Sequence, residues 1–331
     1  MGLPADARGG TLGTVISPGD VIASVFPVYL LIVAGAALRK TGVVRKEHDE
    51  GVMRVVYTVM LPCFMIDKML GSEVLRSGWV VFSAIGLGFG LIMAGVVIGF
   101  AVGRLLGLEK GTGMRTFALA SGSQNFGFTA APVIEILWST GALAMLFVHN
   151  IGVELALWSV GVVIMSGGGG IHWRKLINGP VIAVAAGLLL VATGLDQHLT
   201  GAPRKAISMI GVGAFPLGVM ITGCTIMDLV AAERPSLRII LGSSLVRLLL
   251  APLAILSAAR FLPLAVELKQ VLVVQAAMPA AMTPIMLARM YGGRPAVAVQ
   301  IVVCTTALSL LTLPWIISLG CQWIGLKPLL P

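Results

Sequence analysis

The sequence contains few charged residues. Asp, Glu, Lys and Arg together make up 11% of its 331 residues, whereas hydrophobic residues make up 57%. A soluble globular domain carries about 25% charged residues, so this composition, with a mean hydropathy of +0.99, indicates an integral membrane protein. The apolar runs are near the length of about 20 residues that a helix needs to cross a bilayer. The alternating segments of about ten residues that are typical of a membrane β-barrel are missing.

Cysteine pairs and catalytic motifs are missing as well. The four cysteines, Cys63, Cys224, Cys304 and Cys321, have neither metal-ligand nor redox spacing, and all lie in or beside apolar runs. The sequence holds no H-E-x-x-H, no G-x-S-x-G and no nucleotide-binding loop. We therefore expect no enzyme, no metal and no cofactor, and a primary pump would need a partner chain that binds ATP.

What the sequence does contain is a series of apolar runs that predict ten membrane-spanning helices. The runs cover residues 21–38, 53–70, 79–103, 114–137, 142–165, 176–193, 206–227, 238–259, 266–290 and 296–322. The net charge of +9 comes mostly from Lys and Arg in the gaps, and Arg39 and Lys40 directly follow the first run. Basic residues favour the cytoplasmic side, which predicts an inner (plasma) membrane protein with both termini outside. These residues are typical of contacts with lipid headgroups, and without interleaved aromatic residues they do not indicate nucleic acid.

Proline and glycine landmarks indicate two copies of a five-helix unit. Four pairs are separated by nearly the same number of residues: Pro27 and Pro180, Gly42 and Gly194, Pro62 and Pro216, and Gly141 and Gly293. Because five is odd, the second copy must enter the membrane from the opposite side, which makes an inverted repeat of the kind found in secondary transporters. We predict an all-α membrane protein with a first repeat at residues 1–165, a Gly-rich cytoplasmic linker at 166–175 and a second repeat at 176–331.

Two of the predicted spans are interrupted at corresponding places. The fourth contains SGSQNFGFTAAP, residues 121–132, and the ninth contains QAAMPAAMTPIM, residues 275–286. Proline lacks an N–H and clashes with the preceding turn, so it breaks or kinks a helix. Unwound backbone is tolerated at membrane depth only inside protein or beside a watery cavity. A matched pair of breaks therefore predicts a shared central site, with kinks that serve only helix packing as the alternative.

The chemistry of such a break suits an anion. The half-helix that follows the first break points its positive dipole end at the break, which attracts a group such as a carboxylate. Amide and hydroxyl donors beside it make a full positive charge unnecessary. The candidate substrate-binding residues are Ser121, Ser123, Gln124, Asn125, Gly127, Pro132, Pro279 and Thr283.

Ionisable residues inside the predicted spans are further functional candidates. The candidates for coupling to protons or another cation are Glu135, His149, Asn150 and Glu154. For Glu135 the alternative is a salt bridge or an interfacial position, and for His149, whose ordinary pKa is near neutrality, it is a hydrogen-bonded packing role. We expect Lys68 to reach the outer surface. We expect Arg247 to balance a buried acid, with a direct substrate contact as the alternative.

In these stretches the chain resembles the auxin efflux carrier family, which includes plant auxin exporters and bacterial permeases linked to malate and malonate. The resemblance covers nearly the whole chain. It implies a fold similar to that of bile-acid sodium symporters, with broken helices four and nine crossing. The residues that carry it are Asn125-x-Gly127-Phe128 with Pro132, AAMPAAM at 276–282 with LARMYGG at 287–293, and LFVHNIGVELALW at 146–158.

The chain departs from the plant pattern at the crossover, where the plant Asn-Pro-Asn reads Gln124-Asn125-Phe126. The long hydrophilic loop of many plant members is also absent, so the resemblance does not imply auxin as substrate. Our leading hypothesis is a secondary transporter of small organic anions, coupled to protons, to sodium or to the membrane potential alone. A sodium-coupled organic-anion symporter of the bile-acid type, a channel and a transporter-like sensor are the alternatives. A homodimer in the lipid membrane is compatible with the resemblance.

Overall fold

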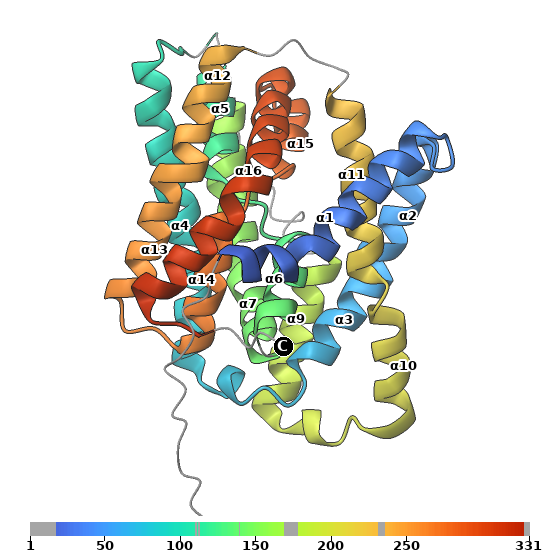
Figure 1. The fold of residues 1–331 in the computed structure, drawn as a ribbon. Coiled ribbons are helices and arrows are strands. Elements are labelled where there is room, and N and C mark those ends of the chain that lie inside the picture. Colours follow the sequence, from blue (N-terminus) through green and yellow to red (C-terminus); the bar gives the residue numbers. More distant parts are fainter. Residues whose placement is uncertain are drawn as a thin grey trace, which may run out of the picture.

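The computed structural model describes residues 18–109, 111, 113–138, 140–168, 178–230 and 236–327. Its regular elements are helices (Figure 1), and the described residues contain no strand beyond an isolated bridge between Gln124 and Ala280. The helices are α1 (Pro18–Lys40), α2 (Asp49–Val55), α3 (Leu61–Met69), α4 (Gly78–Leu105), α5 (Met114–Gly122), α6 (Ala130–Leu137), α7 (Thr140–Ala156), α8 (Val162–Ser166), α9 (Gly179–Thr193), α10 (Gly201–Gly211), α11 (Ala214–Val230), α12 (Leu237–Leu245), α13 (Ala251–Phe261), α14 (Val266–Ala277), α15 (Thr283–Met290) and α16 (Pro295–Ile324). Three π-helical turns connect α2 to α3, α7 to α8 and α12 to α13, at Val56–Met60, Leu157–Gly161 and Val246–Leu250.

Several of these helical stretches are long and apolar enough to cross a membrane, so the chain is a multi-pass membrane protein. Within the described part, the five that qualify are Gly78–Leu105, Thr140–Ser166, Gly201–Leu229, Leu237–Phe261 and Pro295–Ile324. The other predicted spans fall on α1, α2 with α3, α5 with α6, α9, and α14 with α15. Of the predicted linker, residues 169–175 lie outside the described residues.

The helices pack as two bundles, which lie side by side. The first bundle consists of α1, α2, α3, α9, α10 and α11, and the second of α4 to α8 and α12 to α16. In Figure 1, α1, α2, α10 and α11 are on the right, whereas α4, α12 and α13 are on the left. The bundles meet where α1 contacts α6 and α16, and where α3 contacts α7. This interface runs through the middle of the molecule.

Glycines let helices within each bundle approach closely. A Cβ at Gly88 of α4 would lie 2.1 Å from the carbonyl oxygen of His149 in α7. In the first bundle, a Cβ at Gly223 of α11 would lie 2.0 Å from the carbonyl oxygen of Ile32 in α1. Close packing of small residues drives helix association in a membrane, where water supplies no hydrophobic effect between helices. These contacts therefore hold each bundle together as a unit.

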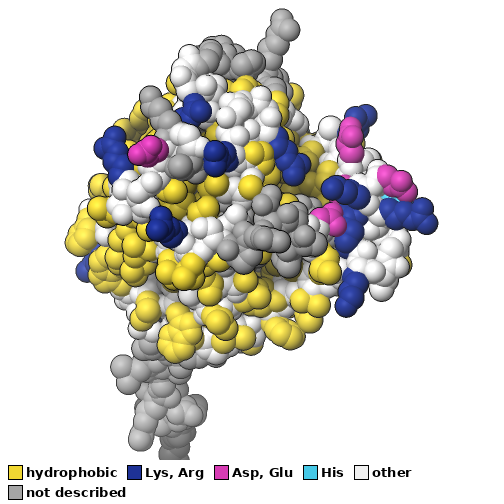
Figure 2. Space-filling model, turned by 90° about the horizontal axis from the view of Figure 1, so that it is seen from above, with side chains coloured by type: hydrophobic (Ala, Val, Ile, Leu, Met, Phe, Trp, Pro, Cys, Tyr) yellow, Lys and Arg dark blue, Asp and Glu magenta, His cyan; other side chains and the backbone are white. Residues whose placement is uncertain are grey.

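Basic side chains gather at one end of the molecule. Figure 2 shows this end, the top of Figure 1, with Lys and Arg side chains spread over it and a charged tip formed by the link between α1 and α2. Beneath this tip, Arg39 pairs with Asp49 of α2, and its Nε lies 3.2 Å from the Oδ1 of Asp228 in α11. Arg39 thus ties α1, α2 and α11 together. Exposed basic residues on segments that end here are Lys40, Arg45, Lys46, Arg104, Arg238, Arg289 and Arg294.

Candidate functional site

The segment between α5 and α6 runs beside the segment between α14 and α15, and the two are hydrogen-bonded. The backbone N–H of Asn125 donates to the Pro279 carbonyl oxygen at 2.7 Å, and the N–H of Ala281 donates to the Ser123 carbonyl oxygen at 2.9 Å. In Figure 1, α5 and α15 lie above these contacts, and α6 and α14 lie below them. The pairing satisfies unwound backbone groups in the middle of the molecule, as a membrane interior requires.

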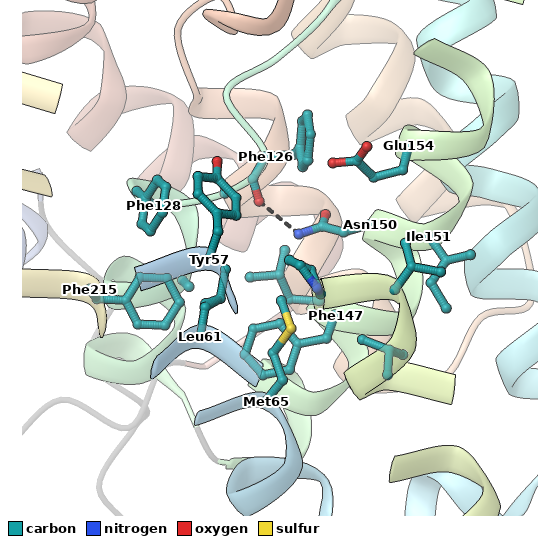
Figure 3. Close-up of a pocket in the computed structure, with 16 residues that line it drawn as sticks. Tyr57, Leu61, Met65, Phe126, Phe128, Phe147, Asn150, Ile151, Glu154 and Phe215 are labelled. Atoms are coloured by element: carbon teal, nitrogen blue, oxygen red, sulfur yellow. Dashed lines mark hydrogen bonds between the residues drawn. The ribbon is translucent and has the colours of Figure 1, made fainter. Parts of the chain in front are cut away.

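A cavity of about 60 Å³ lies between the two bundles beside the first of these segments (Figure 3). Its walls are mostly apolar, and the polar side chains are Tyr57, from the turn before α3, and Asn150 and Glu154 from α7. The Nδ2 of Asn150 donates to the Phe126 carbonyl oxygen at 2.9 Å, which fixes the break against α7. The Oε2 of Glu154 accepts a hydrogen bond from the Trp158 Nε1 at 2.7 Å. The residues labelled around the cavity in Figure 3 are Tyr57, Leu61, Met65, Phe126, Phe128, Phe147, Asn150, Ile151, Glu154 and Phe215.

A second cavity, of about 200 Å³, adjoins the first and is more polar. Both cavities are lined by Tyr57 and by the segment 126–128. A third cavity, of about 10 Å³, includes Pro279. No Lys or Arg is among the described residues that line the three cavities. The polar side chains that line the second are Asp49, Tyr57, Asn125, Thr222, Thr225 and Thr283.

Three of the predicted binding residues lie at the wall of the second cavity. They are Asn125 and Gly127 from the first break and Thr283, the first residue of α15. The Nδ2 of Asn125 donates to the Oγ1 of Thr129, which directly precedes α6, at 3.1 Å. The N-terminal ends of α6 and α15 therefore both lie beside the cavities, each bringing about half a positive charge.

The other predicted binding residues lie behind this wall. The hydroxyls of Ser121 and Ser123 are fully buried and donate to carbonyl oxygens of α5, each at 2.7 Å. Gln124 is also buried, and neither atom of its side-chain amide has a hydrogen-bond partner among the described residues. Pro132 lies in the first turn of α6, and Pro279 accepts the backbone hydrogen bond between the breaks.

The structure separates the four predicted coupling residues. Asn150 and Glu154 line the first cavity. Glu135 instead forms an ion pair with Lys68, and His149 is fully buried in α7 and lines none of the three cavities. Among the described residues, no three His, Cys, Asp or Glu side chains gather as a metal site.

The sequence reasoning overlooked the cavity residues that the first bundle supplies. Tyr57 lines both main cavities, Phe215 lines the first, and Thr222 and Thr225 line the second. Tyr57 is one of three tyrosines in the chain, and the two threonines are polar residues inside an apolar span. These features made the residues noticeable in the sequence. They did not indicate that the side chains lie at the contact between the two bundles.

Arg247 departs from the sequence-based expectation that it balances a buried acid. It is fully buried in the turn between α12 and α13. Its Nη2 lies 3.5 Å from the carbonyl oxygen of Gln275 and 3.4 Å from that of Ala276, in the last turn of α14. No ion pair among the described residues includes it. Arg247 lines none of the three cavities, so the alternative role, a direct contact with substrate, does not fit its position either.

Comparison with known protein families shows which family the chain belongs to. A family model described as a membrane transport protein matches residues 20–172 and 169–317, which is most of the chain. No curated protein matches the sequence. Proteins of this family are membrane transporters rather than enzymes. The chain thus belongs to the membrane transport protein family, the family of the auxin efflux carriers.

Proposed function

We propose that the chain is a secondary transporter that moves small organic anions, such as carboxylates, through the cavities between the two bundles. The observation that carries this proposal is the meeting of two helix breaks at the cavity walls. Each break is followed by an eight-residue helix, α6 or α15, whose N-terminal end lies beside the cavities. Two helix N-termini attract an anion more readily than a cation.

In this proposal the carboxylate lies at the break and the rest of the substrate fills the apolar cavity. Asn125 and Thr283 donate hydrogen bonds to the carboxylate, and Gly127 leaves room for it because a Cβ there would meet no atom within 4 Å. Ser121, Ser123, Gln124, Pro132 and Pro279 shape the break from behind. Because no described Lys or Arg lines the cavities, a monocarboxylate with an apolar body suits the site better than a dicarboxylate.

The two bundles supply the moving parts for alternating access. We propose that one bundle rocks against the other, so that the cavities open to one side of the membrane at a time. The chain would be an inverted repeat of residues 1–165 and 176–331, in which helices four and nine cross at their breaks. Matching helix ends support this, since Gly42 follows α1 with φ +77° and Gly194 follows α9 with φ +74°. The basic end would face the cytoplasm, with both termini outside the inner membrane.

Coupling to an ion is assigned by position. Glu154 is the proposed proton carrier, because it lines the first cavity next to Asn150, which contacts the first break. His149 directly precedes Asn150 in α7, and its proposed role is to hold Asn150 in position. Glu135, in its ion pair with Lys68, lies away from the cavities. A coupled cation would therefore meet the substrate beside α7.

The test is uptake by purified protein in proteoliposomes. Labelled benzoate, malonate and malate are offered under a pH gradient, a sodium gradient or an imposed potential. We expect saturable benzoate uptake that Asn125→Ala reduces at least tenfold. Thr193→Ala is the matched control, because Thr193 is exposed at the end of α9 and lines no cavity. The gradient that drives uptake identifies the coupling.

Two results would overturn the proposal. One is that no anion moves under any gradient, and the other is that Asn125→Ala matches the parent. Uptake that never saturates with concentration would favour a channel. Uptake driven by sodium alone would favour a carrier of the bile-acid type.

A further inference from the structure

Arg247 differs from every other Lys and Arg that the structure describes, because it alone is fully buried. A buried charge without a counter-charge is costly and persists where it compensates something else. Here the compensation comes from the carbonyl oxygens of Gln275 and Ala276, which end α14 just before the second break. Its Nε and Nη1 have no hydrogen-bond partner among the described residues. The charge of Arg247 is therefore held against a helix end and not against a carboxylate.

The position of this charge matters because four helix ends meet at the breaks. The C-terminal ends of α5 and α14 each carry about half a negative charge, and the N-terminal ends of α6 and α15 each carry about half a positive charge. At a distance these four partial charges cancel, so the helix ends alone give an anion little net preference. Arg247 cancels the negative end of α14 and leaves the breaks net positive.

The acidic residues near the cavities make this contribution necessary. Asp49 is paired with Arg39. Glu154 accepts a hydrogen bond from Trp158 but has no ion pair among the described residues. Whenever Glu154 is ionised, its negative charge opposes an anion in the cavity, and Arg247 offsets that charge. Charges act over longer distances inside a protein and membrane than in water, so Arg247 does not need to reach the cavity.

We propose that Arg247 determines the charge selectivity of the carrier without touching the substrate. It makes the paired helix breaks positive enough to hold one carboxylate by neutralising the C-terminal end of α14. The inference rests on the proposed function, since it explains how a cavity without a basic side chain accepts an anion. It differs from a purely structural role, in which Arg247 only caps two carbonyl groups.

Charge and capping are separated by two substitutions. Arg247→Gln keeps an N–H donor for the carbonyl oxygens but removes the charge, whereas Arg247→Lys keeps both. Binding of benzoate and malonate, each compared with its neutral amide, benzamide or malonamide, is measured by calorimetry on purified protein in detergent. We expect Arg247→Gln to weaken carboxylate binding by about tenfold, the order expected for one charge acting through a partly polar medium. Amide binding should stay unchanged, and Arg247→Lys should resemble the parent.

The controls distinguish a failed inference from a failed function. Arg238→Gln removes an exposed charge at the start of α12 and should change neither affinity. If Arg247→Gln does not fold, Arg247→Met is the second neutral variant, of similar length and without a polar group to satisfy. A parent protein that binds neither carboxylate overturns the proposed function, and this inference with it. A parent that binds a carboxylate, with a neutral variant that keeps the same carboxylate-to-amide ratio, overturns the role of Arg247 alone.

Discussion

The Nζ of Lys68 lies 2.5 Å from the Oε1 of Glu135, and this ion pair joins α3 of the first bundle to α6 of the second. Lys68 also lies 5.1 Å from the centre of the Phe64 ring, which packs edge-on against Phe147 of α7 at 6.2 Å between centroids. By contrast, the ion pairs of Arg39 stay within the first bundle. The ion pair between Lys68 and Glu135 thus connects the two bundles at the end opposite the link between α1 and α2, and we call this pair the latch.

Breaking this latch should favour the state in which the cavities open toward Lys68. We predict that Lys68→Glu and Glu135→Lys each raise the labelling of a cysteine at position 61 by a membrane-impermeant maleimide added from that side. The native cysteines are replaced first. Partly exposed ion pairs contribute up to about 1 kcal/mol, so a severalfold change is expected. The double variant, with the charges exchanged, should restore the parental rate, and equal labelling in all variants would show that the pair holds nothing closed.

Two neighbouring glycines of α4 should respond to alanine in opposite ways. A Cβ at Gly88 would lie 2.1 Å from the His149 carbonyl oxygen, whereas a Cβ at Gly86 would meet no atom within 4 Å. We predict that Gly88→Ala lowers the thermal unfolding midpoint in detergent by several degrees, because α4 and α7 must separate. Gly86→Ala should leave it unchanged or raise it, because alanine favours a helix by up to about 1 kcal/mol over glycine. Equal midpoints for both variants would contradict the close contact.

Gln124 offers a way to separate function from stability. Its buried amide has no hydrogen-bond partner among the described residues, so Gln124→Met removes a desolvated polar group and breaks no described hydrogen bond. Satisfying such a group is worth about 1–3 kcal/mol. We predict an unchanged or higher unfolding midpoint together with slower benzoate uptake, because the amide lies in the first break. A variant that unfolds earlier would mean that the amide has a structural partner.

Glu154→Gln tests the coupling assignment. Glutamine retains an oxygen that accepts the Trp158 hydrogen bond, but it carries no charge and no exchangeable coupling proton. If Glu154 carries the coupled proton, a pH gradient should no longer drive net uptake, while exchange of labelled for unlabelled substrate should continue. Glu73→Gln is the matched control, because Glu73 is exposed and lines none of the three cavities. Net uptake that follows the pH gradient in Glu154→Gln would exclude Glu154 as the carrier.

The helical class and the membrane location were predictable because they follow from composition and long apolar runs. The family was predicted from the resemblance of the residues at the two breaks and in the fifth span. The stretch 121–132 was recognisable because glycine, proline and amide residues stand out in such a background. The sequence could not show how the first bundle meets the second. Tyr57 and Phe215 reach the cavity only because α3 packs against both α7 and α11, and these contacts lie between residues distant in the chain.

Individual charged residues were the least predictable. Glu135 was a coupling candidate because it follows the first break, yet the rotation of α6 turns it toward Lys68. Arg247 was expected to face an acid, because a carboxylate is the usual partner of a buried guanidinium. The structure supplies backbone carbonyl groups instead. Spacing along one helix does not reveal which neighbouring helix end a side chain will meet.

Asn125 is hydrogen-bonded to Pro279, and Ala281 to Ser123, through backbone groups. Each half of the chain therefore supplies hydrogen-bond partners that the break in the other half needs. A half produced alone would leave donors and acceptors unsatisfied within the hydrocarbon layer, at several kcal/mol for each group. Neither half is then a stable membrane protein on its own, however apolar its helices are. The two halves could be expressed from separate genes, but each would need to associate with the other in the membrane before its helix break is fully hydrogen-bonded.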